Sequence, residues 1–428
     1  MTKILHYQAP NLARWLSWTL FAVVLIVAPY IFSSGAALSL LSQIGTLMIF
    51  GLSFNMLLGQ GGMLSFGHAV YSGLGAFFAI HAMNLIAAGS LPLPVSMIPL
   101  VGGVAGMGFG VLFGYVTTKK SGTTFSMITL GMVELVFACS LMFPHFFGGE
   151  GGISSNRVIG GAVMGITYGP QIEVYYLIAF WLFVSAVAMY AFTATPLGRM
   201  INAVRDNPER AEFVGYDTQW VRYMTLILSA FFAGISGGLS AINFEIVTAE
   251  NVSAIRSGAV LLFTFIGGIG FFFGPMIGAV IGVFLTVMLS DFTKAWQLYL
   301  GVFFILTVMY APGGLASILM LNVRLLKHGK FAKVWPSLWK VLLSCVLLVA
   351  GLIMAIEMLY QRSLEASQDP IIHVLGLSLN SAAASAWLLA GGLAGLGALG
   401  FILSKQGFRL QWDLANTEIE EILKRAQG

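Results

Sequence analysis

Long apolar segments of roughly 20 residues alternate with short polar segments along most of the 428-residue chain. A helix of that length crosses the hydrocarbon core of a bilayer, because each helical residue adds about 1.5 Å. We predict twelve membrane spans: residues 15–33, 37–58, 69–88, 94–116, 123–143, 173–193, 223–243, 257–272, 275–291, 295–311, 341–360 and 381–403. Gly274-Pro275 interrupts the region 257–291, which is therefore either two full spans or one broken helix.

Composition strengthens this reading. Only 9% of residues are charged, against about 25% in soluble domains, and 58% are hydrophobic. These values exclude an ordinary soluble fold and intrinsic disorder. The 51 glycines are typical of closely packed transmembrane helices. We expect an all-α polytopic membrane protein, with a ten-span core and two additional C-terminal helices. The first apolar stretch is longer than the ~7–15 residues of a signal peptide, so we expect it to be retained.

The distribution of cations predicts the orientation. With alternating spans and a cytoplasmic N-terminus, 17 of the 21 Lys and Arg residues fall on the inner side. The four outer cations are Arg157, Arg256, Lys294 and Arg362. Both termini are thus predicted to be cytoplasmic.

The spans divide the chain into successive regions. We expect an N-terminal segment and first helix at 1–36, then a core at 37–315 that contains an inner loop at 195–222. A basic cytoplasmic linker would follow at 316–340, the two extra helices at 341–403 and a cytoplasmic tail at 404–428. Acidic residues before basic ones near the end of this tail predict a short helix.

Catalytic signatures are missing from the sequence. It contains no phosphate-binding loop of the G-x-x-x-x-G-K-[ST] type, and its six His residues are not at metal-ligand spacing. Cys139 and Cys345 are far apart and suggest neither a disulfide framework nor a metal site. No basic patch with interleaved aromatics indicates nucleic-acid binding. Transport is the default interpretation, and we expect no catalytic residue, metal or cofactor in this chain.

The inner loop carries the densest charge. Leu197, Met200, Ile201 and Val204 are spaced as one apolar stripe of a helix. Asn207-Pro208 reads as an N-cap with its first helical residue and Gly215 as a C-terminal stop, which predicts two short helices with a turn at Asp206-Asn207. The loop is either a solvated connector or a rigid element that inserts its stripe into a partner's groove. The candidate contact residues are Leu197, Gly198, Arg199, Met200, Val204, Arg205, Asp206, Asn207, Glu209, Arg210 and Gly215.

A second group of residues suggests a pathway. Glycines and polar residues interrupt the apolar sequence between Gly51 and Ala69, as at substrate sites of transporters, although a tight inner turn would show the same pattern. Glu134 lies in the middle of a span and is expected to face the bundle interior, as a pathway residue or as a hydrogen-bonded carboxyl. The candidates are Asn55, Gly59, Ser65, Gly67, Thr129 and Glu134.

These motifs resemble a known family. Pro196 to Gly215 resembles the ATPase-docking loop of LivM-type permeases, from ABC importers of branched-chain amino acids. Asn55 to Ala69 is similar to that family's first signature, and Gly148 to Ile153 to its outer loop. Gly267-Gly268-Ile269-Gly270, Gly274-Pro275, Gly278-Ala279 and Ala311-Pro312-Gly313-Gly314-Leu315 match its last third. The resemblance covers about residues 37–315. Such permeases commonly end soon after this point, so the later residues receive no role from it.

The resemblance implies a heteromeric importer in the bacterial inner membrane. Its other components would be a sister permease, two cytoplasmic ATPase subunits that bind the ATP, and a periplasmic substrate-binding protein. The cargo would be branched-chain amino acids or related small solutes. Two alternatives are a proton-coupled secondary transporter that uses Glu134, and a membrane scaffold without transport activity.

Overall fold

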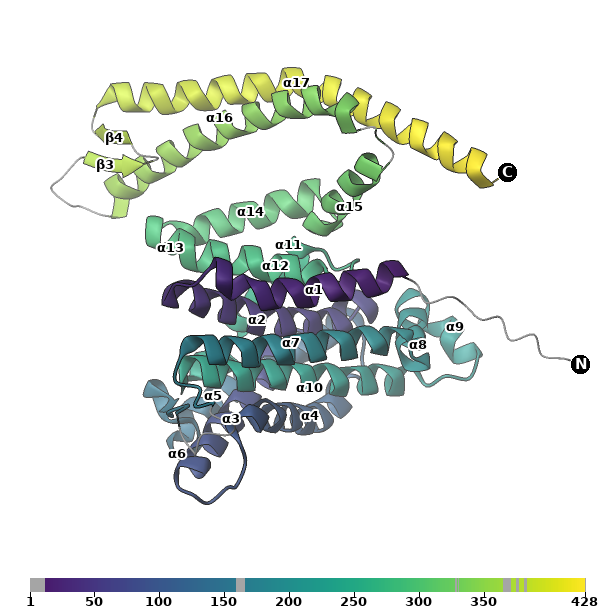
Figure 1. Cartoon of the computed structure of the whole chain (residues 1–428), viewed down its shortest axis with the longest axis vertical. Helices are drawn as coiled ribbons and strands as arrows, with labels where there is room; N and C mark the ends of the chain where they lie inside the picture. Colours follow the sequence, from purple (N-terminus) through teal and green to yellow (C-terminus); the bar gives the residue numbers. More distant parts are fainter. Residues whose placement is uncertain are drawn as a thin grey trace, which may run out of the picture. The chain divides into compact units, whose positions relative to one another are not determined.

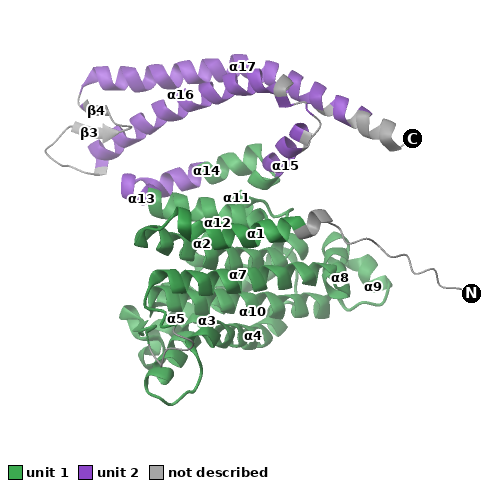
Figure 2. Ribbon diagram, viewed as in Figure 1, with its two compact units in different colours: residues 1–288, 303–316 green, residues 289–302, 317–428 purple. Residues whose placement is uncertain are grey.

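The computed structural model describes residues 12–158, 166–327, 329, 331–364, 371–374, 377–380 and 383–427. The start of the expected N-terminal segment, residues 1–11, and residues 159–165 of the outer loop lie outside the described residues. The chain divides into two compact units, Met1–Met288 with Phe303–Ala316, and Leu289–Val302 with Ser317–Gly428 (Figure 2).

Long helices build the first unit (Figure 1). They are α1 (Leu12–Ile31), α2 (Gly35–Asn55), α3 (His68–Ala87), α4 (Ile98–Thr117), α5 (Gly122–Met142), α7 (Gln171–Ala194), α10 (Thr218–Phe244), α11 (Ala254–Gly267) and α12 (Gly274–Val283). Two π-helical turns, Met56–Gln60 and Phe284–Met288, extend α2 and α12. The shorter elements are α6 (Pro144–Phe147), α8 (Pro196–Asp206), α9 (Pro208–Phe213), β1 (Ile153–Ser154), β2 (Ile246–Val247) and the 3-10 turns Val95–Met97, Gly149–Gly151 and Ala249–Val252.

The membrane spans follow the predicted places. Among the described residues, nine helices are long and apolar enough to cross a membrane, and the pair α14 (Trp296–Tyr310) and α15 (Gly314–Lys327), bent by 53°, would make ten. The other two predicted spans, 15–33 and 257–272, coincide with shorter apolar helices. The region 257–291 is thus a short helix followed by a helical segment long enough to cross, Gly274–Phe292. The chain is an all-α multi-pass membrane protein.

Helix α10 lies at the centre of the first unit and packs closely against α3 and α4. A methyl group on Gly102 would lie 2.5 Å from the carbonyl oxygen of Gly234, and one on Gly237 would overlap the carbonyl oxygen of Ser72. Only glycine permits these backbones to approach so closely. The glycine-rich composition therefore has the role in helix packing that the sequence predicted.

The two ends of the first unit carry different structures. At one end, the glycine-rich outer loop forms an antiparallel pair with β2, with Ile153 opposite Val247. Glu245 ends α10 there and accepts a hydrogen bond at 2.8 Å from the backbone N–H of Arg157. The helices α8 and α9 lie at the opposite end from α6 (Figure 1). The inner loop and the outer loop are thus at opposite ends of this unit.

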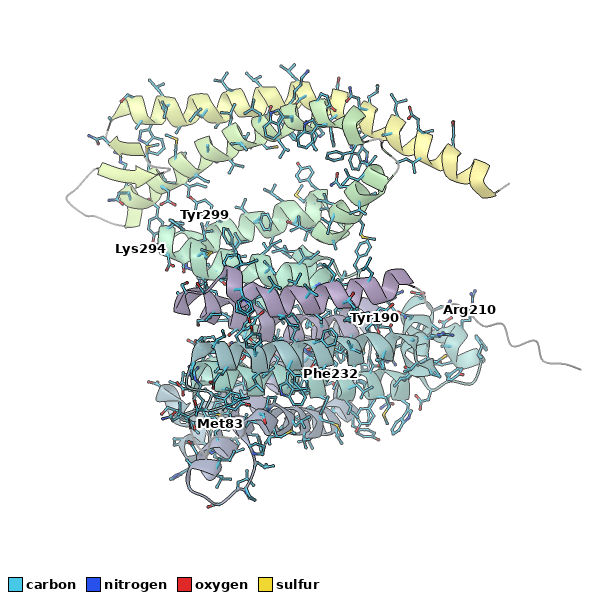
Figure 3. The ribbon with its side chains drawn as sticks, in the orientation of Figure 1. Met83, Tyr190, Arg210, Phe232, Lys294 and Tyr299 are labelled. Atoms are coloured by element: carbon cyan, nitrogen blue, oxygen red, sulfur yellow. The ribbon has the colours of Figure 1, made fainter. Side chains whose placement is uncertain are left out.

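The second unit contains the added C-terminal helices. It holds α13 (Leu289–Phe292), most of α15, α16 (Phe331–Leu364), the hairpin β3 (Ile371–Val374) and β4 (Leu377–Asn380), and α17 (Ala384–Gln427). Within it, Thr293 Oγ1 and Tyr299 Oη donate hydrogen bonds to Glu357 Oε1 at 2.6 and 2.8 Å. Lys294 and Tyr299 are labelled in Figure 3.

The expected linker and tail are both largely helical, and only the separate short helix of the tail is not seen. The segment 316–340 is mostly helical, as α15 and the first turns of α16, and α17 continues through 404–427 without a separate tail helix. Leu325, Val334, Ala415 and Ile419 form a small buried cluster there. Each of these helices contributes only one or two of the four residues, so the cluster is buried only because α15, α16 and α17 pack together.

Candidate functional site

Local sequence signals form the two short helices of the inner loop. Thr195 caps α8 by accepting a hydrogen bond at 3.1 Å from Gly198 N–H, and Asn207 caps α9 by accepting one at 2.9 Å from Arg210 N–H. Pro208 is the first residue of α9, and Gly215 follows its end with a φ of +93°. The predicted pair of helices with a turn at Asp206-Asn207 is confirmed.

The apolar stripe of α8 faces the chain's own bundle. Ile201 and Val204 are buried in the main core, and Leu197 and Met200 pack against the same core. Gly198 also lies against the backbone at the end of α7, where a methyl group would overlap the carbonyl oxygen of Phe192. The stripe is therefore not free to fill a partner's groove, and that part of the interpretation is wrong. The stripe holds α8 on the bundle.

The free surface of the loop contains five of the candidate contact residues. Arg199, Asp206, Asn207, Glu209 and Arg210 are exposed, and Figure 3 shows Arg210 at the tip of α9. The loop also exposes an apolar group that was not predicted from the sequence. Its members are Phe213, Val214, Tyr216 and Trp220, of which Phe213 is 91% exposed. The signal in the sequence for this group is the pair Phe213-Val214, two adjacent apolar residues before Gly215 in an otherwise polar loop.

Arg205 connects the inner loop to the interrupted end of α2. Its Nη1 donates a hydrogen bond at 2.6 Å to the carbonyl oxygen of Gly59, and its Nη2 lies 2.9 Å from Asp206 Oδ1. The stem of Arg205 covers Gly62, where a methyl group would lie 2.8 Å from Arg205 Cγ. Gly62 has a φ of +62° and turns the chain at this point. Two motifs about 145 residues apart in sequence thus form one contact.

The segment between α2 and α3 is irregular backbone held by side chains of α5. The hydroxyl of Ser126 donates to the carbonyl oxygen of Leu64 at 2.7 Å, and Thr129 Oγ1 accepts from Phe66 N–H at 3.1 Å. A methyl group on Gly67 would lie 2.6 Å from the carbonyl oxygen of Thr129. These contacts satisfy backbone groups that a helix would otherwise pair internally.

Unpaired polar atoms lie beside this irregular segment. Asn55 Nδ2 donates a long hydrogen bond, 3.5 Å, to the carbonyl oxygen of Phe271, and its Oδ1 is buried without a partner among the described residues. The Ser65 hydroxyl and Gln60 Oε1 are also buried without a partner. A methyl group on Gly59 would overlap Asn55 Oδ1 and lie 2.6 Å from the carbonyl oxygen of Ile269. The structure thus brings Asn55 against Gly59 and Gly67 against Thr129, with Ser65 in the irregular segment next to Phe66.

Glu134 does not join this group. It is exposed on α5, beside exposed Leu130, Gly131 and Leu135, whereas Met132 and Val133 point into the bundle. The expectation that Glu134 faces the interior of this chain is wrong. Its helix face was not readable from the sequence, because lipid-facing and buried positions of α5 are both apolar.

A metal centre has no support in the part of the chain that the structure describes, where no group of three or more His, Cys, Asp or Glu side chains is placed to hold an ion. His68 is enclosed instead. Its Nε2 lies 3.0 Å from Ser53 Oγ, and its ring stacks on Phe50 with centroids 5.5 Å apart. It helps to join α2 to α3.

Comparison with known proteins gives consistent matches. Residues 36–312 match the family described as the permease component of branched-chain amino acid transport systems. The chain is similar to LivM, the high-affinity branched-chain amino acid transport system permease protein of Escherichia coli K12, at 26% identity over 72% of this chain and 77% of the relative. The LivM of Salmonella typhimurium is also 26% identical, over 68% of this chain and 72% of its own.

A further relative is named for a sugar rather than for branched-chain amino acids. The fructose import permease protein FrcC of Rhizobium meliloti is 25% identical, over 54% of this chain and 67% of the relative. No solved structure matches the chain significantly.

Proposed function

Because the chain belongs to the family of permease components of branched-chain amino acid transport systems, we propose that it forms part of the translocation pathway of an ATP-driven importer. The complete transporter would contain a sister permease, two cytoplasmic ATPase subunits that bind and hydrolyse ATP, and a periplasmic binding protein. It would lie in the bacterial inner membrane, with both termini of this chain in the cytoplasm. Branched-chain amino acids are the proposed cargo, and sugars are the alternative that the fructose permease suggests.

We infer that α8 and α9 are the docking element for an ATPase subunit. Their exposed charges and the apolar group of Phe213, Val214, Tyr216 and Trp220 supply a mixed surface of the kind that protein interfaces use. The stripe beneath them binds the element to the bundle. If the ATPase displaces α8, the groups of the bundle that α8 contacts would therefore move with it.

The contact between Arg205 and Gly59 carries this proposal. It joins the docking element to the π-helical end of α2, where Gly59 lies against the unpaired Oδ1 of Asn55. A charged donor to a carbonyl oxygen contributes about 1.5–3 kcal/mol. Such a bond is strong enough to couple the position of α8 to the conformation of the segment 56–67.

Uptake measurements test the coupling. The complete transporter with Arg205→Ala should keep its ATPase subunits on co-purification but lose about tenfold or more of its ATP-dependent leucine uptake in proteoliposomes. Lys120→Ala is the matched control, because Lys120 is exposed between α4 and α5, outside the proposed docking element, and its side chain has no hydrogen bond or ion pair within the described residues. Equal uptake by both variants would remove Arg205 from the mechanism.

The proton-coupled alternative makes a different prediction. It requires uptake that persists without ATP and that depends on Glu134. Since Glu134 lies on the outer surface of this chain, we expect Glu134→Gln to leave the pH dependence of uptake unchanged. Uptake by the chain alone, insensitive to ATP depletion and altered in its pH profile by Glu134→Gln, would replace the importer proposal with the secondary transporter.

A further inference from the structure

A cavity of about 220 Å³ lies among α2, α10, α11, α12 and the π-helical turn after α12. It is separate from the group of Asn55 and Ser65 and belongs entirely to the first unit. Arg256 lines it from the first turn of α11, shortly after β2. The strand β2 pairs with β1 of the outer loop, at the end of the first unit opposite α8 and α9. The first turn of α11 comes shortly after β2 in the chain.

Arg256 is a cation without a counter-charge. Its Nε is buried and has no hydrogen-bond partner, and within the described residues its side chain forms no ion pair. Its backbone N–H donates a hydrogen bond to Ser253 Oγ at 3.3 Å. A buried guanidinium N–H without an acceptor is costly, and a guanidinium binds carboxylates through two parallel hydrogen bonds. The arginine therefore favours an anionic group in this cavity.

The other polar groups of the cavity offer acceptors. Thr46 Oγ1 donates to the carbonyl oxygen of Gln43 at 2.9 Å, and Thr286 Oγ1 donates to that of Gly282 at 2.8 Å. Ser236 Oγ donates to the carbonyl oxygen of Thr46 at 2.7 Å. A hydroxyl that has used its proton presents only lone pairs to a ligand. These oxygens suit an ammonium group rather than a second anion.

Gln43 adds one amide side chain to the lining, and the rest is apolar, with Leu47, Phe50, Val260, Phe263 and Val283 among its members. A ligand that matches the three parts of the wall has a carboxylate, an ammonium group and a compact apolar side chain. We propose that this cavity binds a free apolar amino acid, with its carboxylate on Arg256 and its ammonium group toward Thr46 and Thr286. This inference rests on the proposed function and adds a cargo site within this chain.

Direct binding tests the site. The complete transporter is placed in phosphatidylcholine nanodiscs without binding protein or ATP, and binding of radiolabelled leucine is measured. Arg256→Gln should weaken binding by about ten- to hundredfold, as loss of a charged hydrogen-bonding group does, and Arg256→Lys should recover part of it. Arg362→Gln is the matched control, because Arg362 is exposed on α16, and it should bind as the wild type does.

Ligand variants give a second readout that does not depend on folding of a mutant. Leucinamide, which lacks the carboxylate, and 4-methylpentanoate, which lacks the ammonium group, should each compete at least tenfold more weakly than leucine. Thr286→Val should reduce the preference for leucine over 4-methylpentanoate. Equal competition by all three compounds would overturn the proposal.

A lipid headgroup is the other anion that Arg256 could bind. Native mass spectrometry of transporter from nanodiscs that contain phosphatidylglycerol separates the two sources. If Arg256→Gln loses a retained anionic lipid while leucine binding is unchanged, the amino-acid site is overturned. If the wild type takes up leucine but Arg256→Gln binds it normally, this inference alone fails; if the wild type neither takes up nor binds leucine, the proposed function fails as well.

Discussion

Helices α10 and α16 have comparable lengths and opposite surroundings. The most apolar 18-residue window of α10 has a mean hydropathy of 1.8 and is 89% buried within the structure, whereas that of α16 has a mean hydropathy of 2.5 and is 22% buried. The more apolar helix is the more exposed one. In a bilayer, lipid accepts apolar side chains as readily as a protein core does, so small and polar residues are what mark the interior. In α10 those residues include Gly234, Ser236 and Gly237.

The largest effect is expected when a glycine is replaced in the buried helix α10 and in the exposed helix α17. Gly237→Ala places a methyl group against the carbonyl oxygen of Ser72 and should lower the free energy of unfolding by about 1–3 kcal/mol or more. Gly392→Ala in α17, with nothing within 4 Å of the added methyl group, should be neutral or slightly stabilising. Thermal unfolding of the purified chain in detergent measures both. Equal losses would show that α10 is no more tightly packed than α17.

A second test concerns exposed apolar residues that lie outside the spans. Phe213→Ala should weaken binding of the ATPase subunit about tenfold, because a buried aromatic anchor at an interface contributes more than 1 kcal/mol. Ile255 is 86% exposed, in the first turn of α11, and Ile255→Ala should leave that binding unchanged. Titration of the purified ATPase onto the permease in nanodiscs gives both affinities. Normal affinity for Phe213→Ala would place the docking surface elsewhere on the chain.

The smallest effect is expected in the second unit. Tyr299→Phe removes the hydrogen bond to Glu357 and should lower the free energy of unfolding by about 1 kcal/mol. Tyr310→Phe is its control, since Tyr310 is 68% exposed at the end of α14. Chemical denaturation in mixed micelles compares the two. A difference near zero would mean that Thr293 alone satisfies the carboxylate.

Features that depend on nearby residues were readable from the sequence. The span positions follow from the length of each apolar run, and Asn207, Pro208 and Gly215 act within a few residues of themselves. The stripe of α8 was also recognised as a buried face, since this helix has water on one side and protein on the other. What covers that face was misread, because the sequence does not distinguish a partner's groove from the chain's own core.

Tertiary structure alone decided the orientation and partners of single side chains. Within a span, water is absent from every face, so the apolar period that reveals a helix's inner side in soluble proteins carries no information, and Glu134 was placed on the wrong face of α5. The bond from Arg205 to Gly59 and the isolation of Arg256 each depend on helices that are distant in sequence. The sequence by itself determined that these charges are few and where along the chain they occur. Only packing decided which of them meet, because a charged side chain is paired or left unpaired by whichever helix lies beside it.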